Sequence, residues 1–319
     1  MQSQTKQSIL YKQIGEMVEK EFKTAKILNC KELTEGFFNV AYEVNLEDNK
    51  NLILKIAPAK ELKVMRSEEN IMKAEVLGLR LIKEQTSVPV PKVYAYDDSY
   101  SILEAPYFFM EKLEGQSLFS YKEKYKEYDD SKILYEAGKL NFQINEITGD
   151  KFGCYAREDR QTDSWFEAFY GILEDTFLDA NDISLDRGIG EKEVLDLLKS
   201  HKKYFEEVKV PRFVHWDLWD GNIFIKDDKI TGLIDFERCM FGDPLIEAGF
   251  RCYAQNKNFL EGYGKTTFSK AETIRMRWYD VYVFSIMSLE YDFRKYESKD
   301  GHNWAVSMLI EALEDLRKK

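Results

Sequence analysis

Residues 213–237 constrain the fold of this chain more than any other stretch. Residues 213–214 and 223–225 are apolar, and they are predicted to form two short strands around a polar loop. After a turn, a third apolar segment ends at Asp235. The second and third strands form a predicted hairpin, and a hairpin brings its two open ends together. Asn222 and Asp235 are therefore expected to be neighbours.

The polar loop carries the spacing His-x-Asp-x-x-x-x-Asn, with His215, Asp217 and Asn222. Transfer of a phosphoryl group needs a carboxylate beside the attacking hydroxyl, oxygen ligands for Mg²⁺ and a cation near the phosphates. Asp217 is the candidate base, and Asn222 and Asp235 are candidate ligands of one metal ion. His215 either takes part in the chemistry or braces the loop. Asp and Asn are also common in ordinary turns, but the complete set between apolar strands favours a catalytic loop.

The same stretch resembles the aminoglycoside phosphotransferase and choline-kinase-like family, whose members are small-molecule kinases with a protein-kinase-like fold. The resemblance rests on three motifs, His215-Trp-Asp-Leu-Trp-Asp-Gly-Asn222, Ile-Asp235-Phe-Glu and Phe-Gly242-Asp243-Pro244. It implies that Asp217 is the catalytic base and that Asn222 and Asp235 hold Mg²⁺. Trp216 departs from the family pattern, because the residue after the histidine is usually small there.

Lys55 stands in an otherwise apolar segment, residues 51–57, which is predicted to be a strand. A buried lysine is costly unless it meets negative charge. Residues 67–85 are predicted to form an amphipathic helix with Glu75 among its core positions. We expect Glu75 to pair with Lys55 and Lys55 to bind nucleotide phosphates, as the third-strand lysine of the family does. The alternative is an edge-strand lysine that points to water.

A turn with one glycine, Gly36, lies between two strand-like segments at residues 33–44. Backbone amides can approach phosphate only where side chains are out of the way, although a lone glycine is also typical of a plain turn. The turn is similar to the single-glycine Gly-x-x-Asn phosphate loop of the family. This similarity adds Gly36 and Asn39 to the predicted nucleotide contacts.

Residues 106–115 are predicted to form a buried strand that runs into a hinge between two lobes. From its place in the chain, the hinge is expected to bind the purine edge through the backbone of Met110, Glu111, Lys112 and Leu113. Met110 is also expected to line the purine pocket. An ordinary core strand would explain the apolar residues equally well.

The predicted architecture is an α+β, bilobal protein-kinase-like fold. Residues 1–113 are expected to form a nucleotide-binding lobe with a five-stranded antiparallel sheet and one large helix. Residues 114–319 are expected to form a mostly helical lobe that carries the catalytic loop and the acceptor site. The main helical segments predicted in this lobe are residues 130–147, 163–178, 191–205, 245–254, 271–296 and 302–317.

The composition predicts a soluble, cytoplasmic protein with a sizeable core, since 44% of the 319 residues are hydrophobic and 32% are charged. The four cysteines are scattered, and the three histidines lack the spacing of a zinc site. A net charge of −11 argues against nucleic acid or an anionic membrane as a partner. The longest apolar runs are too short to cross a membrane.

The predicted function is Mg²⁺-dependent transfer of the γ-phosphate of ATP or GTP to a hydroxyl of a small polar molecule. The acidic charge favours a cationic or amino-sugar acceptor, such as an aminoglycoside. The alternative is a catalytically silent nucleotide-binding module that acts through a protein partner, but such a module is expected to lack a base or metal residue. A protein kinase is disfavoured, because Glu237 replaces the glycine of Asp-Phe-Gly and no Ala-Pro-Glu follows.

Overall fold

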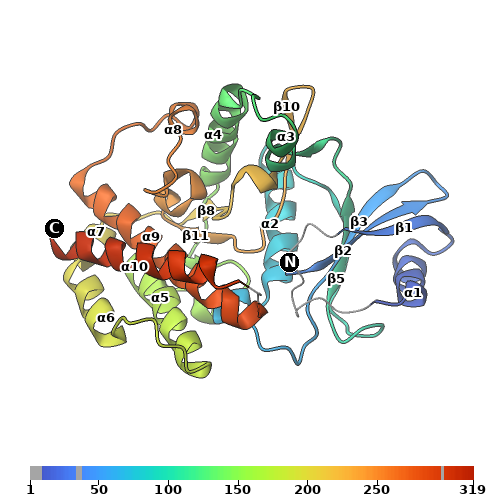
Figure 1. The fold of residues 1–319 in the computed structure, drawn as a ribbon. Helices are drawn as coiled ribbons and strands as arrows, with labels where there is room; N and C mark the ends of the chain where they lie inside the picture. The colour runs from blue at the N-terminus through green and yellow to red at the C-terminus, as the bar shows by residue number, and fades with distance from the viewer. Residues whose placement is uncertain (1–8, 34–37, 296–297) are drawn as a thin grey trace.

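The structure is a computed structural model that describes residues 9–33, 38–295 and 298–319. It has a sheet-rich N-terminal lobe and a helical C-terminal lobe (Figure 1). The predicted α+β, bilobal protein-kinase-like fold is therefore confirmed. The exact lobe boundary at residue 113 stays a prediction.

A five-stranded antiparallel sheet forms the centre of the first lobe, with the strand order β1-β2-β3-β5-β4. The strands are β1 (Ile27–Leu33), β2 (Val40–Leu46), β3 (Asn51–Ile56), β4 (Val93–Asp97) and β5 (Tyr107–Glu111). Helix α1 (Tyr11–Phe22) packs on one face, and helix α2 (Ile71–Gln85) lies on the side of the second lobe (Figure 1).

The alternation of side chains along β3 decides where Lys55 points. Leu52, Leu54 and Ile56 belong to the core cluster that contains residues of α1. Ile53 belongs to the other cluster, which contains residues of α2. Because successive side chains of a strand point to opposite faces, Lys55 shares the face of Ile53 and lies toward α2.

The second lobe is mostly helical, and its long central helix α9 is buried on nearly every side. The helices are α3 (Leu118–Lys124), α4 (Ser131–Asn145), α5 (Trp165–Asp182), α6 (Glu191–Ser200), α7 (Lys202–Phe205), α8 (Lys257–Tyr263), α9 (Lys270–Arg294) and α10 (Asp300–Arg317). Ser269 and Glu272 form a capping box at the start of α9. Within the described ranges, no helix combines the length and apolar character that crossing a bilayer requires.

Two small sheets position the polar loop that follows β8. One sheet contains β7 (Gly153–Cys154), β11 (Met240–Gly242) and β8 (Arg212–Val214). The other contains β10 (Lys229–Leu233), β9 (Ile223–Lys226) and β6 (Gln116–Ser117). Gly115 enters β6 with φ +92°, and a Cβ atom there would lie 2.0 Å from the Ile225 carbonyl oxygen. The connection between the lobes can therefore pass β9 only with a glycine at this position.

Three of the predicted helices differ in detail. Residues 245–254 form two 3-10 turns, Pro244–Ile246 and Ala248–Phe250, because Glu247 between them has an extended backbone. The helix predicted from residue 67 begins at Ile71, after a separate 3-10 turn and a left-handed residue at Asn70. The segment 191–205 is divided into α6 and α7.

Candidate active site

The loop after β8 is held by a buried carboxylate that the sequence analysis missed. Glu247 is fully buried, and its two carboxylate oxygens accept hydrogen bonds of 2.8 Å from the backbone amides of His215 and Trp216. The side-chain amides of Asn141 and Asn145 donate to the same carboxylate at 2.8 and 3.0 Å. Four donors thus compensate for the burial of the charge. No short motif marks this role, because Glu247 lies about thirty residues beyond the loop in sequence.

His215 is fully buried, and both of its ring nitrogens contact backbone groups. Nδ1 accepts from the Asp217 amide at 3.3 Å, so Nε2 carries the proton and donates to the Ile234 carbonyl oxygen at 2.9 Å. The ring also packs on Phe236, with 4.1 Å between ring centroids. Of the two roles that the sequence left open, these contacts favour bracing of the loop.

Trp216 adopts a left-handed conformation, with φ +74°. A small residue would adopt this conformation more readily, since a bulky side chain is strained there. The indole packs beside the guanidinium groups of Arg238 and Arg251, at 5.2 and 4.8 Å from its ring. These cation–π contacts help to offset the strain. Among the described residues, the buried indole Nε1 has no hydrogen-bond partner.

Arg251 supports the loop next to the predicted base, and sequence reasoning missed this residue too. Its Nη2 atom donates to the Trp216 carbonyl oxygen at 2.8 Å and lies 3.6 Å from the nearer carboxylate oxygen of Asp217. The Asp217 side chain is 33% exposed, so an acceptor hydroxyl can approach it. Asn222 donates its side-chain amide to the Asp217 carbonyl oxygen at 2.8 Å, which leaves its own amide oxygen available for a metal ion.

Lys55 bridges the two lobes. Its Nζ atom lies 2.6 Å from a carboxylate oxygen of Glu75 and 2.9 Å from one of Asp235. The predicted contact with Glu75 is therefore present. Burial alone would lower the pKa of Lys55, but Asp235 and Glu75 outweigh it and raise that pKa above its ordinary value. Lys55 is therefore a charged group, as an ion that binds phosphate must be.

Asp235 lies where the hairpin prediction places it. The backbone amide of Ile234 donates to the Asn222 carbonyl oxygen at 3.1 Å, so the two ends of the hairpin meet. Burial would raise the pKa of Asp235, but Lys55 and nearby cations lower it. The carboxylate is therefore ionised and able to bind a metal ion.

Glu237 adds a third carboxylate that the sequence analysis did not assign to the site. Glu75, Asp235 and Glu237 each offer a ligand oxygen within 4.8 Å of the others. Mg²⁺ binds oxygen ligands, and these three carboxylates can supply them. Within the described part of the chain, one oxygen of the fully buried Glu75 has no partner. Burial and Asp235 raise the pKa of Glu237 to about 8, so a bound cation would relieve an excess of negative charge.

Of the nucleotide contacts predicted in the first lobe, Asn39 and the hinge residues lie within the described part of the chain. Asn39 donates its side-chain amide to Glu237 at 3.0 Å, so the end of the predicted phosphate loop reaches the second lobe. Gly36 lies outside the described residues. In the hinge, the amides of Glu111 and Lys112 already donate to Lys92 and Asn51.

Neighbouring strand residues therefore already use these two amides, and the predicted binding of the purine edge by the backbone of the hinge stays a prediction. Met110 is buried and pairs with β3 and β4. Among the described residues, the Leu113 amide donates no hydrogen bond, and it stays a candidate purine contact.

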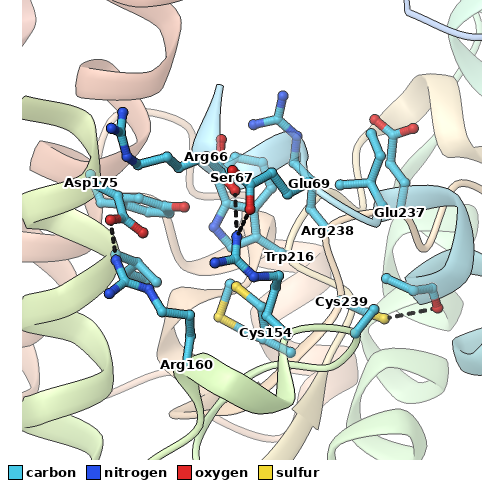
Figure 2. A pocket seen from close by; sticks show the side chains of 17 residues that line it. Arg66, Ser67, Glu69, Cys154, Arg160, Asp175, Trp216, Glu237, Arg238 and Cys239 are labelled. Carbon is cyan, nitrogen blue, oxygen red and sulfur yellow. Dashed lines mark hydrogen bonds and ion pairs between the residues drawn. The ribbon is translucent and has the colours of Figure 1, made fainter. Parts of the chain in front are cut away.

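A cavity lies beside Trp216, between the start of α2 and the catalytic loop (Figure 2). Its charged lining residues are Arg66, Arg157, Arg160, Arg238, Glu69, Asp175 and Glu237. Some of these arginines and carboxylates pair directly with one another in the cavity wall, for example Arg160 and Asp175. The enclosed volume is about 30 Å³, which is room for one or two water molecules.

The chain is similar to known phosphotransferases. A family model described as "phosphotransferase enzyme family" matches residues 29–279. Among solved structures, a thermostable mutant of the aminoglycoside phosphotransferase APH(4)-Ia, in complex with AMP-PNP and hygromycin B, has a TM-score of 0.68 at 16% identity over 94% of this chain and 97% of that one. A putative fructosamine-3-kinase from Thermobifida fusca has a TM-score of 0.68 at 16% identity, over 94% of this chain and 98% of that one. The streptomycin–ATP complex of APH(2")-IIa has a TM-score of 0.59 at 17% identity, over 98% of both chains.

These similarities in structure concern the fold. One curated relative, a probable acyl-CoA dehydrogenase, IBR3, of Arabidopsis thaliana, is 23% identical over 184 residues. The match covers 54% of this chain but 22% of that protein. The chain therefore spans about a fifth of the length of this relative, and no dehydrogenase activity is carried over from it.

Proposed function

The chain belongs to the phosphotransferase enzyme family, which makes it a small-molecule kinase, and we propose that it transfers the γ-phosphate of ATP to a hydroxyl of a small polar acceptor. The observation that carries the proposal is the position of Lys55, which joins Glu75 of the first lobe to Asp235 of the second. Such a cation, next to a carboxylate suited to a metal ion, is what binding of a triphosphate requires.

In the proposed mechanism Asp217 orients the acceptor hydroxyl and takes its proton. Its exposure and its place on a braced loop support this role. Lys55 binds the phosphates, and Glu75 keeps it in place. Asn222, Asp235 and Glu237 would hold Mg²⁺, which would neutralise charge that develops on the phosphates. The Leu113 amide would bind the purine edge, and Asn39 would lie at the end of the phosphate loop.

ATP is the proposed nucleotide, with GTP as the alternative. AMP-PNP and ATP are bound in two of the similar structures, which supports this choice. The acceptor is proposed to be cationic or an amino sugar, since the chain carries a net charge of −11. Two of the similar structures bind hygromycin B or streptomycin and a third is a putative fructosamine kinase, which supports the same class of acceptor.

Release of nucleoside diphosphate by the purified protein tests the proposal. The protein is incubated with Mg²⁺, ATP or GTP and a panel of aminoglycosides, macrolides, choline, sugars and fructosamines. We expect one class of acceptor to stimulate release. Nucleotide binding without stimulation by any acceptor would instead favour the silent module that acts through a protein partner.

A further inference from the structure

A cluster of four charged side chains joins the segment before α2 to the second lobe. Glu68 lies in the 3-10 turn Arg66–Glu68 and is buried. One of its carboxylate oxygens lies 2.8 Å from Nη2 of Arg294 and 3.5 Å from Nη2 of Arg238. The same two nitrogen atoms lie 3.1 and 3.2 Å from a carboxylate oxygen of Glu290 in α9. Two arginines and two glutamates thus balance their charges, which the burial of charge requires.

The two arginines of this cluster differ in the aromatic ring that each contacts. The guanidinium carbon of Arg238 lies 5.2 Å from the centre of the Trp216 ring, in the catalytic loop. That of Arg294 lies 5.4 Å from the centre of the Phe38 ring, in the first lobe. The cluster therefore contacts the catalytic loop through Arg238, while Arg294 provides the same ion pairs on the other side.

The contact with Arg238 depends on the large side chain of Trp216. A small residue would adopt the left-handed backbone conformation at this position more readily, but its side chain would not reach the guanidinium. The indole is 5% exposed, so it is packed on nearly every side. Because Trp216 is joined to Asp217 by a planar peptide bond, a cation that holds the indole also limits how far the base can move.

The segment that carries Glu68 also determines the position of α2. Arg66, two residues earlier, pairs with Asp179 of α5 at 2.5 Å, so this end of α2 is attached to the second lobe twice. Helix α2 carries Glu75, whose carboxylate contacts Lys55 at 2.6 Å. The same short segment is therefore connected to the phosphate-binding lysine through α2 and to the catalytic loop through the charge cluster.

We propose that Arg238 is a positioning residue that links the placement of α2 to the placement of the base. The proposal rests on the assignment of Asp217 as that base. Glu68 and Glu290 hold the guanidinium, the guanidinium holds the indole of Trp216, and the indole fixes the peptide before Asp217. In this role Arg238 acts through Trp216 and not on the reacting atoms.

Arg238→Ala and Arg294→Ala form a matched pair, because each variant leaves the other arginine to pair with both glutamates. Both variants of the full chain should therefore fold. With ATP, Mg²⁺ and an acceptor that the wild type phosphorylates, Arg238→Ala should lower kcat about tenfold with little change in KM for ATP. Arg294→Ala should keep kcat within about twofold of the wild type. Equal kcat values in the two variants would overturn the proposal.

Arg238 also lies next to Glu237, and a double-mutant cycle separates the two neighbours. Once Trp216→Leu has removed the indole, adding Arg238→Ala should change kcat by less than about twofold, because the two substitutions remove the same contact. A further tenfold fall in the double variant would show that Arg238 acts through another group, such as Glu237, and would overturn the role of Trp216.

Hydrogen exchange tests the same contact without turnover. Exchange in residues 215–219 should be about tenfold faster in Arg238→Ala than in the wild type, and unchanged in Arg294→Ala. Equal exchange in the three proteins would overturn the proposal even if the wild type phosphorylates an acceptor. If no acceptor is phosphorylated, the proposed function fails, and the exchange rates alone decide whether Arg238 holds the loop.

Discussion

Replacing Glu247 by glutamine should loosen the catalytic loop without touching any group that is proposed to contact substrate. The carboxylate accepts two backbone amides of the loop, from His215 and Trp216, directly before Asp217. In the glutamine variant one oxygen becomes an amino group, which is itself a donor. Wherever this group is placed, at least one buried amide loses its acceptor.

The size of the effect follows from these hydrogen bonds. A hydrogen bond to a charged group contributes about 1.5–3 kcal/mol, and a buried donor without a partner costs about 1–3 kcal/mol. The glutamine variant keeps most of the shape and loses the charge, so we expect the free energy of unfolding to fall by about 3 kcal/mol. Because Asp217 is displaced from its position, kcat should fall by roughly 10- to 100-fold, with little change in KM for ATP.

Urea unfolding and steady-state kinetics measure both effects. Glu207→Gln is the control, because this glutamate is 56% exposed and its buried partner Arg275 keeps a second carboxylate partner, Asp243. It should change stability by less than about 0.5 kcal/mol. If Glu247→Gln is as stable and as active as Glu207→Gln, the proposed support of the loop is wrong.

Three further predictions concern the rest of the molecule. Glu75→Gln should raise KM for ATP by roughly tenfold while the protein stays folded, because Lys55 loses its fixed partner; an unchanged KM would argue against this role. Glu237→Gln should weaken Mn²⁺ binding by the protein–nucleotide complex, as measured by electron paramagnetic resonance, and unaltered binding would remove Glu237 from the ligand set. Burial would raise the pKa of Asp97, but the hydrogen bonds that Lys20 and other donors make to it outweigh burial and lower this pKa. The ionised carboxylate of Asp97 should therefore stabilise the fold at neutral pH, and this stabilisation should be lost below about pH 4. Acid unfolding of Asp97→Asn should show a weaker pH dependence than the wild type, and identical curves would contradict the pairing.

Those parts of the site whose residues are close together in the chain, or follow a regular period, could be predicted from the sequence. A hairpin explains why Asn222 and Asp235 meet, and strand alternation explains why Lys55 faces α2. The charge of a buried lysine then requires a partner such as Glu75. These inferences need only local geometry and the cost of burying a charge.

The supports of the catalytic loop could not be predicted in this way. Glu247 and Arg251 contact the loop only because the chain returns to it about thirty residues later. The same contacts explain the wrong helix prediction at residues 245–254, where apolar periodicity suggested a helix. The extended backbone at Glu247 interrupts any helix there, and its carboxylate binds the loop. Tertiary contacts therefore override the local pattern at this position.

The most direct test of the proposed function is to incubate the wild type and Asp217→Asn with ATP, Mg²⁺ and each acceptor. Mass spectrometry then measures how much phosphorylated acceptor each protein forms. Asparagine preserves the size of the side chain but cannot accept the proton. We predict that the wild type phosphorylates a hydroxyl of one acceptor class and that the variant binds ATP with similar affinity but forms no product. Equal product formation by the two proteins would contradict the assignment of Asp217 as the base.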